Sequence, residues 1–271
     1  MKLSIIIPAH NAEDSIVATL DGITAVLANG GIDYEILVVA DHCVDRTAHK
    51  VCLATEHNPS IHCITSPYPS GYGHAVRAGL DTFQGDAVVI MSADGSDSPS
   101  DLLTYHRLLV AGYDCVFGSR FLRGSQTRGY PLPKLILNRV GNLGLRMLFR
   151  HGYNDTTNAF KAYQRHVIDL IQPLISAQFN LTVEMPLKAI VRGASYAVVP
   201  IDWNRQTSTG SKFHIQEAGS RYLFISLYVL FEHHLTGGDY RDPSLPGSRR
   251  GRWRAGHPSI VLRHKNVPLD A

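Results

Sequence analysis

The sequence predicts an α/β fold in which helices flank a Rossmann-like, mostly parallel central sheet. Over the first hundred residues, short apolar runs alternate with amphipathic helical patterns, which is the rhythm of right-handed βαβ units. The run at residues 87–91 is apolar throughout, as expected of a parallel strand that is buried on both faces. Polar residues follow several of these runs directly, and ligands collect at the carboxyl ends of strands in such sheets.

The elements of the first half are bounded by turn and stop signals. We expect strands at residues 3–7, 34–39, 61–64 and 87–91, and helices at 13–27, 45–55 and 75–83. The first helix ends at Asn29-Gly30-Gly31, a sequence typical of a helix stop. Pro8 is expected to end the first strand, because proline has no N–H for a central ladder. The glycine-rich segment 71–79 opens the third helix and offers N–H groups that suit an anion.

Beyond Asp94 the alternation of strands and helices becomes less regular. We expect helices at 99–109, 132–150, 181–191 and 213–235, strands at 115–117 and 196–201, and polar loops at 118–129, 154–159 and 204–212. The apolar centre of the last helix, residues 222–231, is about half as long as a membrane-spanning helix. From residue 238 onward the chain is rich in Pro, Gly and Arg, a composition that predicts no fixed structure.

The basic charge of the chain is concentrated at its carboxyl end. The formal net charge is +3, and residues 238–271 hold seven Lys or Arg against three Asp or Glu, so the remainder is close to neutral. This distribution argues against nucleic acid as a partner and favours contact of the tail with an anionic surface. No apolar stretch approaches the roughly 20 residues of a membrane-spanning helix. Four cysteines without C-x-x-C spacing indicate free thiols and a cytoplasmic location, with a peripheral position on the membrane left open.

Carboxylates stand where two of the predicted strands end. Asp94 and Asp97 follow the fourth strand, and carboxylate oxygens at such an edge can hold a divalent cation that in turn holds phosphate. Asp41 follows the second strand and is expected to accept hydrogen bonds from a base or ribose, whereas Asp45 is expected to cap the next helix. For Asn11, a capping role and a ligand contact both remain open.

The order of these motifs resembles the family 2 glycosyltransferases. The chain carries I-P-x-x-N from residue 7, V-V-x-D-x-x-x-D-x-T from residue 38, G-x-G-x-A-x-x-x-G from residue 71, and A-D at 93–94. Three further motifs resemble the dolichyl-phosphate mannosyltransferase branch, whose members transfer sugars to polyprenyl phosphates. They are Gly118-Ser119-Arg120, Asp155 to Phe160-Lys161, and Arg205 before Gly210-Ser211-Lys212. The resemblance spans roughly residues 3 to 235.

This resemblance implies a GT-A fold, a UDP- or GDP-sugar donor, an Mg²⁺ or Mn²⁺ ion, and inversion at the anomeric carbon. By position, the residues that would border the nucleoside are Pro8, Asn11, Glu13 and Asp41. Asp94 would be the remaining acid of the family's D-x-D metal motif. The first acid of that motif is Ser92 here, which can hydrogen-bond ribose or water but is a poor cation ligand, and Asp97 is the candidate to compensate. Ala40 replaces the acid that usually precedes Asp41.

Basic residues on the predicted loops are candidates for phosphate binding. An arginine fork suits bidentate contact with phosphate, and lysine acts as a point charge. We expect this role for Arg120, Arg205 and Lys212. Arg123 and Arg128 suit a solvated surface equally well.

The acceptor decides whether the reaction needs a general base. A phosphate acceptor is ionised near neutral pH, whereas a hydroxyl acceptor needs a carboxylate within hydrogen-bond reach. Asp155 is the first candidate for that base and Glu184 the second, although Glu184 could equally be the structural partner of a loop arginine. Asp94, with the metal, would stabilise the departing diphosphate.

We therefore expect a metal-dependent hexosyltransferase that moves a sugar from a nucleotide sugar to a polyprenyl phosphate of the dolichyl or undecaprenyl type. The alternative is a soluble glycosyltransferase that acts on a hydroxyl of a glycan or small molecule. The expected organisation is a GT-A domain at 1–212, with a nucleotide-sugar half at 1–97 and an acceptor half at 98–212, an amphipathic helix at 213–237 and a basic flexible tail at 238–271. That helix lies in the membrane interface, or it packs on the body or on a second copy in a homo-oligomer.

Overall fold

An eight-stranded sheet forms the centre of the computed structural model, which describes residues 1–204, 215–236 and 259–262. In spatial order its strands are β10 (Ile260–Val261), β8 (Tyr196–Pro200), β5 (Cys115–Ser119), β7 (Lys161–Gln164), β4 (Ala87–Ile90), β1 (Leu3–Ala9), β2 (Tyr34–Ala40) and β3 (Ile61–Thr65). Every neighbouring pair is parallel except the two that involve β7. A second, two-stranded sheet pairs β6 (Thr127–Arg128) with β9 (Trp203–Asn204).

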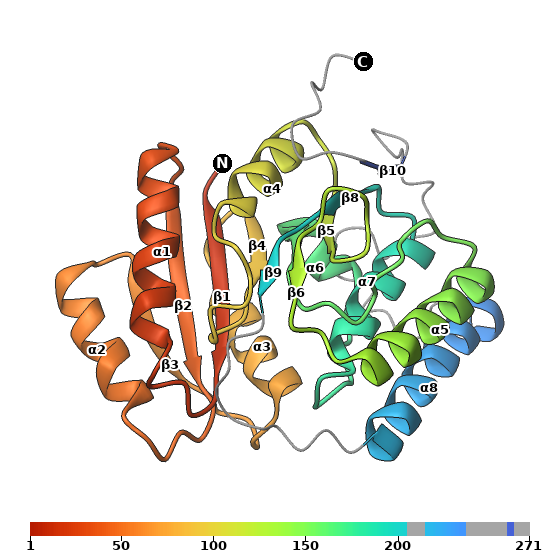
Figure 1. Ribbon diagram of the computed structural model, residues 1–271, viewed down its shortest axis with the longest axis horizontal. Coiled ribbons are helices and arrows are strands. Elements are labelled where there is room, and N and C mark those ends of the chain that lie inside the picture. The colour runs from red at the N-terminus through yellow and green to blue at the C-terminus, as the bar shows by residue number, and fades with distance from the viewer. Residues whose placement is uncertain (205–214, 237–258, 263–271) are drawn as a thin grey trace.

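Helices cover both faces of the main sheet (Figure 1). They are α1 (Ile16–Asn29), α2 (Thr47–His57), α3 (Tyr72–Leu80), α4 (Asp101–Val110), α5 (Leu132–Phe149), α6 (Arg165–Leu170), α7 (Leu181–Val191) and α8 (Ile215–Phe231), the last continued by the π-helical turn η1 (Glu232–Thr236). Leu20 of α1 and Leu102 of α4 pack with Ile5 of β1 on one face, whereas Val76 of α3 packs with Ile6 on the other. This alternation follows because successive side chains of a strand point to opposite faces.

The predicted elements of the first half are present, with ends shifted by a few residues. The expectation that Pro8 ends the first strand is wrong, because β1 continues to Ala9 beside β2. The amide of Met91 donates to the carbonyl of Ile6, so Ile6 turns its backbone polar groups toward β4. Pro8 faces the same side, where β4 has already ended at Ile90, and its missing N–H therefore leaves no ladder acceptor without a donor.

The sequence pattern predicts no strand at β7, which is short, begins with a lysine and runs antiparallel between β4 and β5. Its first residue, Lys161, pairs with Ile90 near the end of β4 and with Phe117 of β5. Because β7 runs against its neighbours, the loop that precedes it meets the carboxyl ends of both strands. The reversal of β7 thus brings residues 154–158 to the edge where ligands of a parallel sheet collect.

The expectation of a tail without fixed structure is wrong for residues 259–262. There β10 pairs with β8, and Leu262 is buried in the core. The rest of the tail lies outside the described residues. All four cysteines are free thiols, as predicted. Within the ranges that the structure describes, no helix combines the length and the apolar character that crossing a bilayer requires.

Helices α5 and α8 pack together at one end of the molecule rather than on the sheet (Figure 1). Leu145 and Phe149 of α5 contact a small core cluster that contains Ile225 and Val229 of α8 together with residues of α7. The only buried residue of α5 is Asn142. The segment predicted as an amphipathic helix at 213–237 therefore packs one face on the body, as far as its residues are described.

Candidate active site

A cavity of about 820 Å³ begins beyond the carboxyl end of β4 and extends between α5 and α8. Three parts of the chain line it. The turn after β4 contributes Ser92, Asp94, Ser96 and Asp97; the neighbouring loops contribute Arg120, Tyr130, Thr157, Asn158, Ala159 and Trp203; and α5, α7 and α8 contribute mainly apolar residues and glycines. The cavity is therefore polar where it meets the sheet and apolar where it runs between the helices.

The turn after β4, residues 92–97, brings two carboxylates to one wall of the cavity. Asp94 is exposed, and its Oδ1 accepts a hydrogen bond from the Ser96 amide at 3.0 Å. Asp97 is only 2% exposed, and its Oδ2 accepts one from the Ser92 amide at 3.0 Å. Burial, with a smaller contribution from the charge of Asp94, raises the pKa of Asp97 to about 6, against the hydrogen bonds from Ser92. The three residues that the sequence singles out here, Ser92, Asp94 and Asp97, thus share one wall.

Arg120 faces these carboxylates across the cavity lining and is held by Asp155. The Asp155 carboxylate accepts hydrogen bonds from Nε at 2.8 Å, from Nη2 at 2.7 Å and from the Arg120 amide at 2.9 Å. Only 9% of the Arg120 side chain is exposed. Burial lowers the pKa of Arg120, but the ion pair with Asp155 more than offsets this and keeps the guanidinium charged. The guanidinium also interacts with the Tyr130 side chain, which lines the same cavity.

Aromatic rings complete the surroundings of this guanidinium. Its Cζ lies 5.4 Å from the ring centroid of Phe121, 5.2 Å from that of Tyr130 and 5.8 Å from that of Trp203. Cation–π contacts of this kind stabilise a charge that burial has removed from water. Arg120 is therefore a fixed positive group at the polar end of the cavity.

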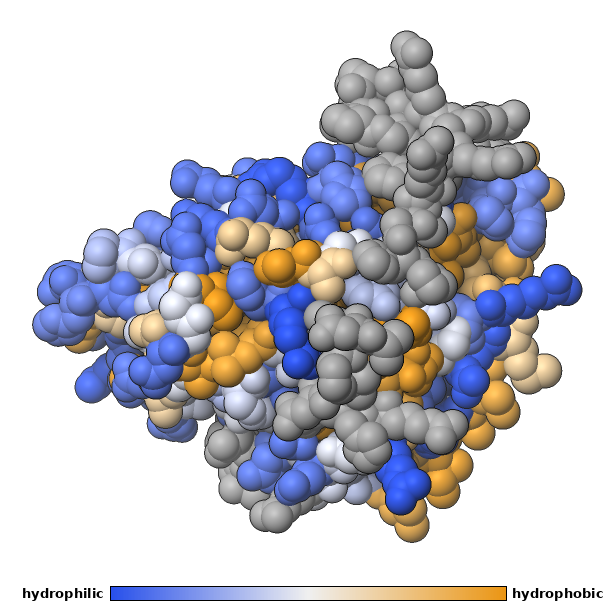
Figure 2. Space-filling view, turned by 90° about the horizontal axis from the view of Figure 1, so that it is seen from above, coloured by the Kyte–Doolittle hydropathy of each residue, from blue (hydrophilic) through white to orange (hydrophobic). Residues whose placement is uncertain are grey.

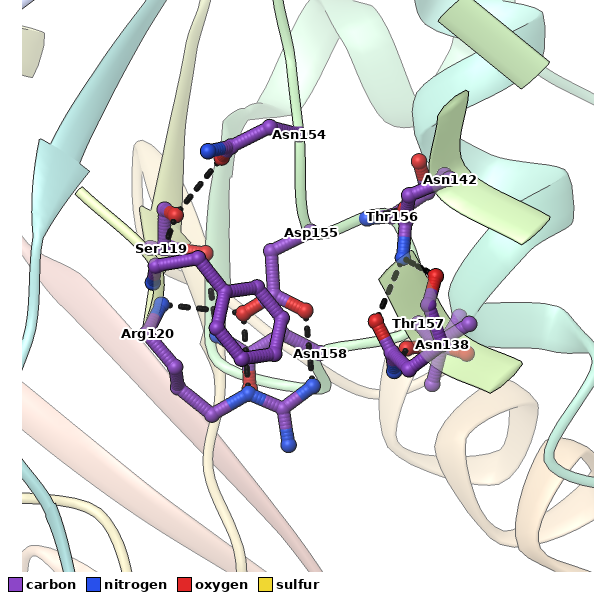
Figure 3. A network of polar contacts seen from close by, with 12 residues as sticks. Ser119, Arg120, Asn138, Asn142, Asn154, Asp155, Thr156, Thr157 and Asn158 are labelled. Atoms are coloured by element: carbon purple, nitrogen blue, oxygen red, sulfur yellow. Dashed lines mark hydrogen bonds and ion pairs between the residues drawn. The ribbon is translucent and has the colours of Figure 1, made fainter. Parts of the chain in front are cut away.

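The loop that carries Asp155 is tied to α5 and to β5 by paired polar side chains (Figure 3). The Ser119 hydroxyl donates to Asn154 Oδ1 at 2.6 Å. Asn138 Nδ2 donates to the Thr157 hydroxyl at 2.5 Å, and the Thr156 amide donates to Asn142 Oδ1 at 2.6 Å. These bonds fix the loop, and with it the carboxylate that orients Arg120.

Beneath the loop lies a buried lysine, Lys161. Its ammonium donates to the carbonyls of Thr156 and Thr182, each at 3.0 Å, and to that of Asn158. Burial lowers the pKa of Lys161 to about 7, against the attraction of Asp155. The sequence marks Lys161 only as part of a motif. The structure shows that Lys161 holds the loop before β7, because β7 starts at this residue and its ammonium binds carbonyls of that loop.

The residues predicted to border the nucleoside lie at the ends of β1 and β2, outside the lining of the cavity. Asn11, at φ 50°, accepts a hydrogen bond from the Val44 amide at 2.9 Å and caps no helix, since α1 begins at Ile16. Glu13 accepts one from the Arg46 amide at 3.1 Å. Both side chains thus connect the loops after β1 and β2.

Asp41, at the tip of β2, is buried and holds the glycine-rich turn before α3. Its Oδ2 accepts hydrogen bonds from the Gly71 amide at 2.9 Å and the Ser70 hydroxyl at 3.3 Å. The amides of Gly73 and His74 donate to the carbonyl of Ala177. The expectation of an anion at this helix start is wrong, because its N–H groups already have protein acceptors.

Two of the predicted catalytic carboxylates, Asp155 and Glu184, are fully buried and do not line the cavity. Asp155 gives both oxygens to Arg120. Glu184 accepts hydrogen bonds from the Ile175 and Ser176 amides and pairs with Lys188 at 2.8 Å. The expectation that either acts as a general base is corrected by this geometry, which assigns both to the scaffold. For Glu184 the structural alternative holds, with a lysine on its own helix in place of a loop arginine.

The remaining predicted residues either do not line the cavity or lie outside the described part of the chain. The N-cap of α2 is Arg46 and not Asp45 as expected, although Asp45 Oδ1 accepts a hydrogen bond from the amide of Thr47, the first residue of the helix, at 2.9 Å. Arg205 and Lys212 lie outside the described residues, as does the side chain of Arg128. Arg123 is exposed and does not line the cavity.

The largest part of the site that sequence reasoning missed is the wall formed by α5. Lys134, Leu137, Asn138 and Asn142 line the cavity from this helix. The amphipathic pattern predicts a helix at 132–150, but an apolar stripe ordinarily packs on a core. Here most of the stripe is exposed, a property that periodicity does not reveal.

Comparison with known sequences identifies the family. The sequence model described as glycosyl transferase family 2 matches residues 4–171. The chain belongs to this family. It is thus a glycosyltransferase, and the resemblance stated from its motifs is confirmed.

The names of two curated relatives of this family 2 glycosyltransferase refer to the same branch of the family that its motifs resemble. Polyprenol monophosphomannose synthase of Mycolicibacterium smegmatis is 30% identical over 225 residues, which are 79% of this chain and 83% of the relative. Dolichol-phosphate mannosyltransferase of Pyrococcus furiosus is 26% identical over 207 residues, which are 71% of this chain and 57% of that protein.

Solved structures with a similar fold include glucosyl-3-phosphoglycerate synthase of Mycobacterium tuberculosis in complex with UDP. It matches with a TM-score of 0.65 and 18% identity, covering 84% of this chain and 80% of that one. The same synthase in complex with Mn²⁺, UDP and phosphoglyceric acid matches with a TM-score of 0.61 and 18% identity, over 85% and 78% of the two chains. The predicted GT-A fold is confirmed by this likeness.

The turn after β4 offers a donor set that suits Mg²⁺ or Mn²⁺. Asp94 and Asp97 are hard oxygen donors on one wall, and Mg²⁺ is commonly held by one or two carboxylates, waters and substrate phosphates. No group of three His, Cys, Asp or Glu side chains in the described ranges could hold an ion.

Proposed function

We propose that this glycosyltransferase moves a hexosyl group from a UDP- or GDP-sugar to a polyprenyl phosphate, with inversion at the anomeric carbon. One observation carries the proposal. A single cavity joins the carboxylates of the turn after β4 and Arg120 at one end to an apolar channel between α5 and α8 at the other. The names of the two curated relatives support it, because both refer to mannosyl transfer to a polyprenol-type phosphate.

The polar end of the cavity suits the phosphate of the acceptor. The buried guanidinium of Arg120 lines this end and carries a positive charge, and Lys134 of α5 lines the same cavity. An arginine that is already oriented loses little entropy when it binds a phosphate oxygen. The channel beyond it is lined by Leu137, Leu145 and Leu148 of α5 and by residues of α8, surroundings that suit an isoprenoid chain.

The donor would lie between the ends of β1, β2 and β4. Pro8, Asn11, Glu13 and Asp41 would border its nucleoside, and Ser92 would contact the ribose. The carboxylates of Asp94 and Asp97 would hold the divalent cation. When bound, that cation supplies charge stabilisation for the diphosphate that departs.

The acceptor needs no general base in this scheme. A phosphate monoester is ionised near neutral pH and can attack the anomeric carbon directly. Arg120 would hold the phosphate and orient one oxygen toward the sugar, and Asp155 would fix the direction of Arg120. Asp155 and Glu184 both bind protein groups, and this agrees with a reaction in which no carboxylate has to accept a proton.

An apolar surface beside the cavity supports peripheral contact with a membrane. Ile136, Val140 and Met147 of α5 and Leu223 and Phe224 of α8 are all large, apolar and exposed. Figure 2 shows apolar side chains gathered along the side of the molecule where Figure 1 places these helices. Exposed apolar patches of this kind mark interaction surfaces, and a lipid surface is where a polyprenyl phosphate resides.

In the proposed organisation, residues 1–212 form the catalytic domain, with a donor half at 1–97 and an acceptor half at 98–212. Residues 213–237 form an interfacial helix, and the basic tail 238–271 adds attraction to anionic lipids. Arg205 and Lys212 are proposed as further phosphate ligands from the sequence motif alone.

A transfer assay tests the proposal directly. Radiolabelled UDP- and GDP-hexoses are offered with Mn²⁺ to undecaprenyl and dolichyl phosphate in detergent, and separately to soluble hydroxyl acceptors. We expect label in the lipid fraction, and loss of that label in Asp94→Asn, whose thermal unfolding should match wild type. Label in the hydroxyl acceptors alone would contradict the acceptor, and full activity of Asp94→Asn would contradict the site.

A further inference from the structure

The proposed acceptor channel contains three glycines inside helices, Gly141 and Gly144 of α5 and Gly219 of α8. All three line the cavity. None has a positive φ, so none is required by the backbone conformation. Glycine is among the poorest residues for a helix interior, so an explanation must lie in packing or in function.

Packing does not explain these glycines. At Gly73 and Gly79 of α3, an added Cβ would lie 2.3 Å from Ser176 O and 2.7 Å from Ile6 Cγ2, so a neighbour occupies the space. At the three cavity glycines an added Cβ would meet nothing within 4 Å. The absent side chains therefore leave room in the cavity rather than room for another part of the described protein.

The space beside the three glycines belongs to the same cavity as Arg120, and the charge of Arg120 indicates which kind of ligand the cavity holds. Arg120 is nine-tenths buried, lines the same cavity and places a positive charge at its polar end, beside Lys134 of α5. A ligand that satisfies both ends has an anionic head and an apolar chain. Soluble phosphates have no apolar part for the channel, and neutral lipids have no group for Arg120.

We propose that Gly141, Gly144 and Gly219 set the width of the channel so that it admits the methyl-branched isoprenoid chain of the acceptor. They act as specificity-determining residues, and this inference rests on the proposed polyprenyl phosphate acceptor. A larger side chain at these positions would occupy the volume of the chain while leaving the donor site and Arg120 unchanged.

The test compares Gly144→Leu and Gly219→Leu with wild type, using undecaprenyl phosphate and the shorter geranyl phosphate as acceptors. We expect the KM for undecaprenyl phosphate to rise about tenfold with little change in kcat, because ground-state binding of the chain is lost. The KM for geranyl phosphate and for the donor should stay within about twofold. The melting temperature should be equal or higher, because leucine favours the helix.

Val110→Leu is the matched control, because it also introduces leucine at an exposed helical position. Val110 ends α4, is 60% exposed and does not line the cavity, so its kinetics should match wild type. Gly144→Ala provides a smaller change should a leucine variant fold poorly, with an intermediate rise in KM expected.

Unchanged KM values for undecaprenyl phosphate in folded leucine variants would overturn the inference and leave the proposed function standing. A wild-type enzyme that transfers sugar to neither polyprenyl phosphate would instead overturn the proposed function. A rise in KM of equal size for both acceptors would also overturn the inference, because it would place the effect at the phosphate and not along the chain.

Discussion

The ion pair between Arg120 and Asp155 shows how one residue serves both stability and chemistry. A buried charge is costly unless it is paired and hydrogen-bonded, and Asp155 supplies three of the bonds that Arg120 needs. The paired guanidinium also lines the cavity, where it is proposed to hold the acceptor phosphate. Removing Asp155 should therefore harm the fold and the orientation of the guanidinium together.

Asp155→Asn should lower the free energy of unfolding by about 3 kcal/mol, because it leaves a buried guanidinium without its counter-charge. Urea unfolding checks this. In the double variant Arg120→Met/Asp155→Leu, much of that stability should return while transfer stays absent. Wild-type stability in the single variant, or transfer in the double variant, would contradict the role given to the pair.

His151, which follows α5, should make the protein sensitive to acid. Burial lowers the pKa of His151 to about 4, and the charge of Arg146 adds to the effect. Its Nδ1 accepts a hydrogen bond from the Tyr153 amide, whereas Nε2 is buried without a partner among the residues that the structure describes. The unfolded chain therefore binds a proton near pH 6.5 that the folded chain refuses, so stability is present above that pH and lost as pH falls toward 4.

Replacing His151 by Asn keeps an acceptor for Tyr153 and removes the titration. The wild type should lose up to about 3 kcal/mol of stability from this group between pH 7 and pH 4, and His151→Asn should lose that much less. Urea unfolding at both pH values gives the difference. Equal losses in the two proteins would show that His151 does not carry the acid sensitivity.

At the scale of elements, α5 and α8 differ from the other helices that surround the sheet. Helix α5 buries only Asn142, and its Met147 is 73% exposed. Two side-chain bridges, from Asn138 and Asn142 to the loop at 156–157, connect it to the site. A helix with so little burial gains stability when its apolar face meets a partner.

Placing charges on that face should weaken membrane binding without harming the chemistry. Val140→Glu/Met147→Glu should lower the fraction of protein that co-sediments with anionic vesicles, because glutamate is costly in an apolar interface and repelled by the lipid charge. Transfer to geranyl phosphate in solution should stay near wild type. Unchanged co-sedimentation would place the membrane contact elsewhere or remove it.

The sequence predicts regular elements well and exceptions poorly. Strands β1, β2 and β4 are mainly apolar runs, and their burial on both faces makes them easy to recognise. Strand β7 escapes because it opens with a charged residue, Lys161, whose burial depends on the carbonyls of Thr156, Asn158 and Thr182.

The same limit applies to the site. The acidic positions Asp94 and Asp97 are predictable, since a strand ends just before them and short-range geometry places them together. The scaffold role of Asp155 is not, because only the tertiary structure brings Arg120 near it. For Glu184, helical spacing indicates Lys188 as a partner, but not the amides of Ile175 and Ser176 that fill its oxygens. A carboxylate in a motif looks the same in sequence whether it holds a proton or an arginine.

For the molecule as a whole, the proposed nucleoside site and the proposed cation and acceptor site lie at different strands along the carboxyl edge of the sheet. The ends of β1 and β2 carry the residues proposed for the nucleoside, and the cavity beyond β4 carries those proposed for the cation and the acceptor. The proposed donor diphosphate would lie between them, so nucleotide and cation should bind cooperatively.

Thermal unfolding should reveal this coupling. UDP or GDP together with Mn²⁺, at about a hundred times the dissociation constant, should stabilise the fold by about 2.7 kcal/mol, which raises the melting temperature by a few degrees. EDTA should abolish the shift, and Asp94→Asn should show little of it. A full shift without the cation would argue that nucleotide binding does not need the carboxylates.

The bare apolar side formed by α5 and α8 also bears on handling the purified enzyme. In water without a bilayer, the exposed apolar side chains of these helices are best buried against another copy of the protein. Concentrated samples should therefore self-associate through this surface. Such assemblies should dissociate in mild detergent. A molecular size measured without detergent would therefore reflect this self-association and not an oligomeric state of the enzyme at a membrane.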